Sequence, residues 1–177
     1  MMPKPWRALV ICAGLAATGP AYAQSAERVA AHTDWAVFVA GNPRECYIVS
    51  PPTTSVARRG GESVDVRRGD IRLFVAFRPG EDVENEVSFT GGYPFRDGST
   101  VELEIGGDSF DMGPGEGDAV EWAWTNPADD ASAVAAMRRG ATATITGLSS
   151  RGTTTIDTFS LMGFTAAVTD AEARCTE

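Results

Sequence analysis

The sequence predicts an all-β protein: an antiparallel β-sandwich, or barrel-like pair of sheets, with one or two short helices near the C-terminus. Three observations lead to this class. Short runs of alternating apolar and polar residues recur along the chain, roughly eight to ten of them. Turns rich in Gly and Pro separate these runs. Only two segments, both in the C-terminal third, have helical spacing and end signals.

Two hairpins are predicted in the first two thirds of the chain. In the first, Val64–Val66 forms one strand and Ile71–Phe77 the other, and Arg68-Gly69-Asp70 forms the tip. In the second, Val101–Ile105 alternates with two glutamates and is followed by Gly106-Gly107, which supplies the positive φ angles of a type I′ turn.

Further strands are predicted around Val87 and Phe89, and over 120–124. In the second of these, Trp122 and Trp124 share a face and Glu121 points the other way. A strand over 141–145 is followed by a turn and a threonine-rich strand that ends near Leu161. Ile156 is out of phase with that last strand, which leaves either a bulge or an outward side chain.

Two short helices complete the expected elements. Asp129 and Asp130 are suited to begin a helix that Arg138-Arg139 and Gly140 would end. A second helix is predicted from Thr165 to Arg174. The predicted core consists of alternating apolar residues from these strands: Trp35, Val37, Val64, Leu73, Val75, Val101, Leu103, Ile105, Phe110, Trp122, Phe159 and Leu161.

The N-terminus has the pattern of a secretory signal peptide. Lys4 and Arg7 precede an apolar stretch, and Ala21-Tyr22-Ala23 fits a signal-peptidase site, so we expect cleavage after Ala23. The expected organisation is a signal peptide over 1–23, a flexible leader over 24–33 and a single β-sandwich domain over 34–177. The expected location is the periplasm or the exterior of the cell.

Export changes the cysteine count. Of three cysteines, one lies in the signal, and Cys46 and Cys175 remain in an oxidising compartment. Two thiols in a small exported domain favour one disulfide, and the absence of a Cys-x-x-Cys pattern favours a structural bond over a redox-active one.

The charge balance excludes some partners. Without Lys4 and Arg7 the 15 basic residues fall to 13, against 24 acidic residues. A chain this acidic is not expected to have the clustered basic face that nucleic acid or an anionic membrane surface requires. No second apolar run has transmembrane length. The partner is therefore expected to be another envelope component or a host protein, and the sequence does not set an oligomeric state.

Few residues offer catalytic chemistry. His32 is the only histidine and lies in the expected leader, so it is interpreted as solvated. Glu121 beside Trp122 and Trp124 is compatible with glycan binding or weak glycan hydrolysis, because sugar rings stack on tryptophan and glycosidases use carboxylates. Buried tryptophans with an outward carboxylate are the preferred interpretation.

Two loops have a functional alternative. The glycine-rich run with Asp108, Asp111, Glu116 and Asp118 has calcium-type ligands but no EF-hand spacing, so a solvated turn is preferred. Arg68-Gly69-Asp70 matches an integrin-binding tripeptide at an expected hairpin tip. The same residues are also typical of turns, and a turn is the preferred interpretation. No motif indicates a metal or a cofactor.

The segments Ala133–Gly140 and Asp157–Val168, the latter reading DTFSLMGFTAAV, resemble the invasion-associated locus B family of exported alphaproteobacterial proteins. Asp34-Trp35, Glu45-Cys46-Tyr47 and Gly98–Ile105 extend the resemblance over most of the chain. Many members have further cysteines where this chain has 37–39 and 120–124, so the additional disulfides are absent.

The resemblance implies an envelope or secreted protein, with host-cell invasion as a role of some members, and it maps no catalytic motif onto this chain. Trp35, Leu161, Gly163 and Phe164 are interpreted as structural, because Gly163 permits a tight strand-to-helix junction and Phe164 can close one end of the sandwich. The expected function is non-enzymatic binding. Trp122, Trp124, Arg68 and Asp70 are the candidate contacts.

Overall fold

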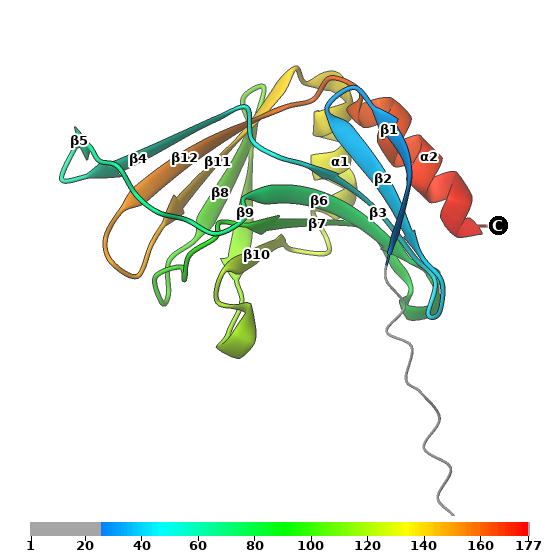
Figure 1. The fold of residues 1–177 in the computed structure, drawn as a ribbon, viewed down its shortest axis with the longest axis horizontal. Coiled ribbons are helices and arrows are strands. Elements are labelled where there is room, and N and C mark those ends of the chain that lie inside the picture. Colours follow the sequence, from blue (N-terminus) through cyan, green and yellow to red (C-terminus); the bar gives the residue numbers. More distant parts are fainter. Residues whose placement is uncertain (1–25, 177) are drawn as a thin grey trace, which may run out of the picture.

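The described chain folds around one antiparallel sheet. The computed structural model describes residues 26–176, which form twelve strands, two α-helices and two short 3-10 helices (Figure 1). The predicted signal peptide and residues 24–25 lie outside the described residues. The strands are β1 (Glu27–His32), β2 (Trp35–Ala40), β3 (Glu45–Ser50), β4 (Thr54–Arg59), β5 (Glu62–Ser63), β6 (Arg72–Arg78), β7 (Val83–Thr90), β8 (Val101–Ile105), β9 (Asp108–Pro114), β10 (Trp122–Thr125), β11 (Thr142–Leu148) and β12 (Thr154–Ser160). The helices are η1 (Pro79–Glu81), η2 (Gly117–Ala119), α1 (Asp130–Arg139) and α2 (Phe164–Thr176).

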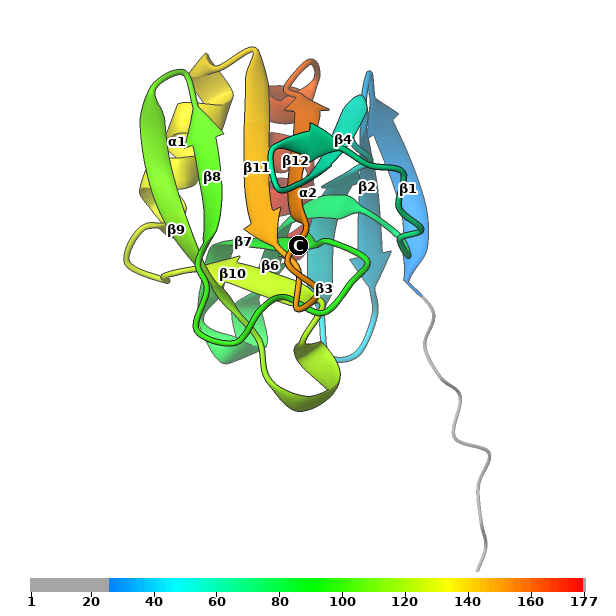
Figure 2. The same ribbon diagram turned by 90° about the vertical axis from the view of Figure 1, so that its left-hand side faces the viewer.

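The predicted all-β antiparallel class is confirmed. The strand order is β1-β2-β3-β6-β7-β10-β9-β8-β11-β12-β4-β5, and the sheet is not closed. It bends so that its halves face each other, and in Figure 2 the strands β8, β11 and β12 cross β6, β7 and β10. Phe89 of β7 meets Phe159 of β12 edge-on at 6.1 Å between ring centroids, although four strands separate β7 from β12 in the sheet. The core lies inside this bend, so the expected pair of sheets is two halves of one continuous sheet.

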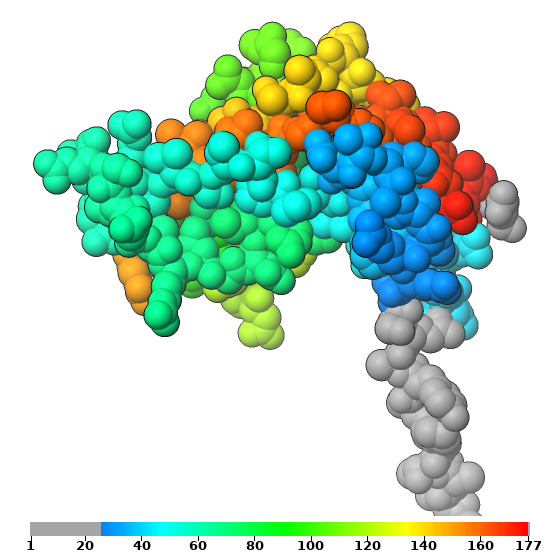
Figure 3. All heavy atoms as spheres, turned by 45° about the horizontal axis from the view of Figure 1, so that its top comes forward, coloured from blue at the N-terminus to red at the C-terminus, as the bar shows by residue number. Residues whose placement is uncertain are grey.

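Helix α2 covers the inner face of the first half. It buries Phe164, Ala167, Val168 and Ala171, which lie on one side of a helix at spacings of three and four. The disulfide between Cys175 and Cys46 then joins its last turn to β3, as the sequence predicted. In Figure 3 the N-terminal strands and this C-terminal helix lie side by side, in agreement with the contacts of α2 with β1 and β2.

Helix α1 occupies the position predicted for it, but its N-terminus is built differently. Asp129 forms no side-chain cap. Asp130 turns inward instead, where its Oδ1 accepts hydrogen bonds from the Val87 N–H (3.3 Å) and from the Thr125 hydroxyl. Burial raises the pKa of Asp130, and these two hydrogen bonds oppose the increase.

The Gly106-Gly107 hairpin is confirmed. Its two glycines have φ angles of 60° and 98°, as a type I′ turn requires. The preceding strand β8 is paired in register with β9. Ile156 takes the second of the two alternatives left open for it: β12 has no bulge, and Ile156 is on the outer face while Asp157 points into the core.

The hairpin predicted across Arg68-Gly69-Asp70 is wrong, although its second strand is confirmed as β6. Val64–Val66 forms no strand; the preceding Glu62–Ser63 pairs with β4, and β6 pairs with β3 and β7. The chain between β5 and β6 instead crosses close to the end of β7: Gly69 N–H donates to the Gly92 carbonyl at 2.8 Å.

The leader predicted over 24–33 is wrong for Glu27–His32, which form β1 and pair with β2. His32 is not a free solvated side chain, because its Nε2 lies 2.9 Å from Asp170 Oδ2 of α2. The hydrogen bond with His32 lowers the pKa of Asp170, and the hydrogen bond with Arg174 lowers it further by a smaller amount. The sequence of β1 resembles a leader because it is polar in part, and it is polar because this edge strand is partly exposed.

Nine of the twelve predicted core residues are buried. Val64, Phe110 and Trp122 are the exceptions, and each is only partly buried. Val64 lies outside any strand, and Phe110 packs at the margin of the core. In β10 the small residues Ala123 and Thr125 face inward, so the two tryptophans face outward. This inversion creates the site described below.

Candidate functional site

Five half-buried aromatic rings form a continuous row on the outer face of the first half of the sheet. Neighbouring ring centroids are 5.1 Å apart for Phe38 and Tyr47, 6.0 Å for Tyr47 and Phe74, 5.3 Å for Phe74 and Trp122, and 6.1 Å for Trp122 and Trp124. The row therefore crosses β2, β3, β6 and β10. It brings together positions 38 to 124, which only the sheet topology makes adjacent.

A groove forms along this row because two small residues lie between the rings. Ser88 of β7 is paired with Phe74 on one side and with Trp124 on the other. Ala76 of β6 is likewise paired with Tyr47. The small side chains form the floor and the rings form the walls of a cavity of about 430 Å³. Helix η2 contributes Asp118 and Ala119 to its rim.

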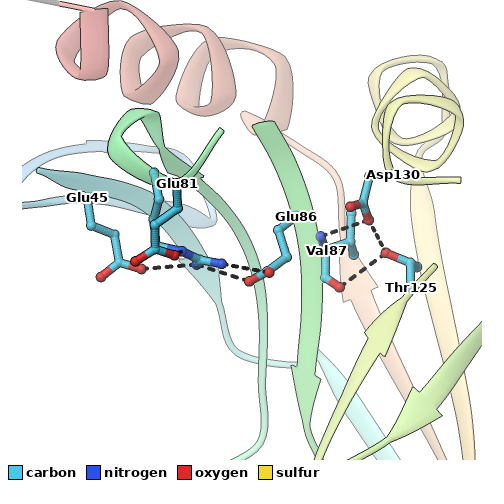
Figure 4. A network of polar contacts seen from close by, with 7 residues as sticks. Glu45, Glu81, Glu86, Val87, Thr125 and Asp130 are labelled. Atoms are coloured by element: carbon cyan, nitrogen blue, oxygen red, sulfur yellow. Dashed lines mark hydrogen bonds and ion pairs between the residues drawn. The ribbon is translucent and has the colours of Figure 1, made fainter. Parts of the chain in front are cut away.

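One end of the groove is charged. The guanidinium of Arg78 donates to Glu86 at 2.7 and 3.1 Å, to Glu81 at 3.0 Å and to Glu45 at 3.4 Å. Figure 4 shows these three carboxylates converging from different elements. The hydrogen bond that Arg78 donates to Glu86 is the largest cause of the raised pKa of Arg78, so its positive charge is fixed. Burial, and then the charge of Glu45, raise the pKa of Tyr47 nearby.

The geometry fits a binding surface for a ligand with both apolar and polar faces. Half-buried rings offer flat apolar contacts that stay accessible, and carboxylates, Ser88 and the Tyr47 hydroxyl offer hydrogen-bond partners at fixed positions. Because Arg78 occupies oxygens of Glu45 and Glu86, these carboxylates have a defined orientation.

Of the candidate contacts, Trp122 and Trp124 lie in the groove, whereas Arg68 and Asp70 do not. Arg68 is buried and forms a bidentate ion pair with Asp157 at 2.7 and 2.6 Å; the side-chain exposures are 7% and 0%. Its Nε also donates to the Gly91 carbonyl at 2.8 Å. The Asp70 side chain is 86% exposed. The tripeptide is therefore not displayed as an exposed hairpin tip.

The residues of the C-terminal motif form a structural junction. The indole N–H of Trp35 donates to the Ser160 carbonyl at 3.0 Å, and its ring meets Phe164 edge-on at 5.0 Å. Leu161 is buried beside them. Gly163 has a φ of 88°, and a Cβ on it would overlap the carbonyl oxygen of His32. This motif joins β12, α2 and the end of β1.

The acidic run is spread over a strand and a 3-10 helix. Asp108 and Asp111 are in β9, where Asp108 lies 3.6 Å from Arg139, and Asp118 is in η2. Within residues 26–176, no three His, Cys, Asp or Glu side chains are grouped to hold a metal ion. Glu121 lies outside the groove, at a second cleft considered below.

Sequence reasoning missed Phe38, Tyr47, Phe74 and Arg78. The signal was present, since each aromatic residue alternates with a core residue of its strand, for example Phe74 between Leu73 and Val75. Large aromatic residues on the face of three strands that would otherwise be polar indicate an apolar surface suited to an interaction.

The comparisons with known proteins place the chain in a family. The model described as "Invasion associated locus B (IalB) protein" matches residues 71–172, more than half of the chain. The protein therefore belongs to the IalB family, an envelope-associated family, and the predicted resemblance is confirmed. No match was found among curated proteins or among solved structures. In the described part of the chain, neither helix has the length and apolar character needed to cross a bilayer.

Proposed function

We propose that this IalB-family protein is a non-enzymatic binding module of the cell envelope whose aromatic groove binds an oligosaccharide segment. The observation that supports the proposal most strongly is the continuous row of half-buried rings beside fixed carboxylates. A sugar ring presents C–H groups on its faces and hydroxyls at its edge. Stacking would bury the first, and Glu45, Glu86 and Ser88 would accept or donate hydrogen bonds with the second.

The size and openness of the site favour an extended ligand. The cavity volume of about 430 Å³ is within the range of roughly 300–1,000 Å³ typical of ligand sites. The row continues beyond the cavity to Phe38, which stacks on Tyr47 with an angle of 5° between the ring planes. A chain of sugar units can use several platforms at once, whereas a compact ligand would use only the central part.

Binding without hydrolysis is supported by the arrangement of the carboxylates. A glycosidase needs one carboxyl group able to give a proton and a second one free to act as base or nucleophile. Of the carboxylates that line this groove, Glu45 and Glu86 accept hydrogen bonds from Arg78, and Asp118 at the rim is the one outside this network, so no two free carboxylates of the described residues face the cavity. Glu45 and Glu86 hold the guanidinium of Arg78 and present oriented hydrogen-bond acceptors.

Co-sedimentation with purified peptidoglycan, and retention on immobilised envelope oligosaccharides, test the proposal. Wild-type protein should be retained, and the double variant Trp122→Ala/Trp124→Ala should lose at least about tenfold in affinity, since each stacked ring contributes about 1 kcal/mol or more. Phe110→Leu, which removes a half-buried ring from the other half of the sheet, should bind normally. Retention should produce no new reducing ends. Equal retention of the double variant and the wild type would contradict the groove as the site.

A further inference from the structure

A second cleft shares no lining residue with the aromatic groove. It is bounded by the turn between β11 and β12, by the chain between β5 and β6, and by the residues after β7, and its volume is about 440 Å³. Four arginines line it: Arg59, Arg67, Arg68 and Arg151. Two carboxylates, Asp65 and Glu121, line it as well. Because Asp157 neutralises Arg68, the lining keeps a small excess of positive charge, in a chain whose net charge is −9.

Three of these arginines have no carboxylate partner. Only Arg68 is paired, with the buried Asp157. Arg59, Arg67 and Arg151 are exposed and form no ion pair within residues 26–176, where acidic residues outnumber basic ones. Unpaired arginines gathered around one cleft produce a local positive potential, which concentrates anions there.

The cleft is held in shape by its own hydrogen bonds. Arg59 donates from Nε and Nη2 to the Thr153 hydroxyl at 3.1 and 2.7 Å, which fixes the plane of its guanidinium. Ser150 N–H donates to the Pro94 carbonyl at 2.9 Å, so two walls are tied together. Beneath them, Arg68 lies 4.9 Å from the ring centroid of Tyr93. A ligand would therefore meet the guanidinium of Arg59 in a fixed orientation, with little loss of side-chain freedom at that residue.

We propose that this cleft binds the phosphoryl group of a small phosphate ester or of a lipid headgroup. Guanidinium groups donate two parallel hydrogen bonds to an oxyanion. A phosphoryl group has enough oxygens to accept from three arginines at once, whereas a carboxylate has only two. The hydroxyls of Ser150 and Thr153 add neutral donors at the cleft. This site is independent of the aromatic groove and needs no residue of it.

Isothermal titration of the folded protein at low ionic strength tests the proposal, with inorganic phosphate and glycerol 3-phosphate as soluble probes. Phosphatidylcholine vesicles with and without phosphatidic acid form a separate arm. Arg67→Gln and Arg151→Gln should each weaken binding by about tenfold, as expected for a lost charge-assisted bidentate contact. The conservative Arg151→Lys should retain part of the affinity, because it keeps the charge but not the fork.

Arg28→Gln is the matched control, since Arg28 is an exposed arginine of β1 that does not line the cleft. Binding of the soluble probes that is sensitive to Arg67 and Arg151 supports a small-molecule ligand, and binding confined to phosphatidic acid vesicles with the same sensitivity supports a lipid headgroup. Equal weakening by Arg28→Gln and Arg151→Gln would reduce the effect to net charge and overturn the proposal. Absence of binding in every arm, with an unchanged melting temperature, would overturn it too.

Discussion

The backbone of Gly163 lies directly against the carbonyl group of His32, so that any Cβ at position 163 would overlap that oxygen. The contact joins the turn before α2 to the end of β1. The φ angle of Gly163 is 88°, in the left-handed region, where residues with a Cβ are disfavoured. Gly163 lies within the segment Asp157–Val168 that carries the family resemblance, so this part of the segment has a structural reason.

Replacing Gly163 by Ala should lower the free energy of unfolding by about 2–4 kcal/mol, because backbone strain and overlap add together. Replacement by Val should cost more. Gly113→Ala is the control, since no atom lies within 4 Å of a Cβ built there and its φ is not positive. Chemical denaturation measures both. A Gly163→Ala variant as stable as Gly113→Ala would show that this junction is looser than described.

The stability of the fold should depend on Arg68 and Asp157 being present together. Asp157→Ala leaves a buried guanidinium without its partner, so we expect a loss of about 3–5 kcal/mol in the free energy of unfolding. The double variant Arg68→Met/Asp157→Leu should be more stable than either single variant, because both charges are removed together. Asp70→Ala, two residues away and exposed, should change stability by less than about 0.5 kcal/mol. Additive losses in the double variant would contradict the pairing.

The disulfide should contribute through the length of chain it closes. Its cysteines are 129 residues apart, and restriction of the unfolded chain over such a loop corresponds to about 4–5 kcal/mol. Cys46→Ala/Cys175→Ala should therefore unfold at markedly lower denaturant concentration while keeping its far-ultraviolet circular dichroism. Reductant should shift the wild type to the same midpoint and leave the variant unchanged. A reductant-insensitive wild type would contradict this prediction.

The sign of one pH effect follows from Asp130. Burial raises its pKa in the folded protein, so the folded state holds this proton more tightly than the unfolded state does. The contribution to stability is greatest below the ordinary aspartate pKa and is lost as the pH rises through the raised value. Asp130→Asn removes this titration. The free energy of unfolding of the wild type, relative to Asp130→Asn, should thus fall as the pH rises above about 3.9, the ordinary aspartate pKa. A relative stability that rises with pH above this value would contradict the raised pKa.

The sequence predicted the elements better than it predicted their environment. Strict alternation defined β8 and its glycine hairpin, because the relevant interactions are between neighbours in the chain. Alternation also grouped Trp122 with Trp124, but it could not say which face of β10 is the core. In the structure the core face of β10 carries Thr125, whose hydroxyl donates to the Val87 carbonyl and to Asp130 of α1, and these contacts join β10 to β7, which is remote in sequence.

The same limit applies to both clefts. The aromatic row joins four strands, and the arginine cleft is lined by five separate stretches of the chain between residues 59 and 155. Arg68 seemed to be an exposed turn residue because its partner, Asp157, is 89 residues away and interrupts an otherwise apolar face. Alternation along a strand shows which residues share a face of the sheet. Contacts with residues far away in the sequence determine which polar residues on that face are buried.

The most direct test of the account is a tryptophan fluorescence titration with soluble envelope oligosaccharides. The described chain contains Trp35, which is 1% exposed, and the half-buried Trp122 and Trp124. If the groove binds sugars, the ligand should shift the wild-type emission to shorter wavelength with saturation. Trp122→Phe/Trp124→Phe leaves buried Trp35 as the only tryptophan of residues 26–176, with Trp6 in the predicted signal peptide, so this variant should show no shift. An emission spectrum that no oligosaccharide alters in the wild type, or an equal shift in the double variant, would contradict glycan binding at the aromatic groove.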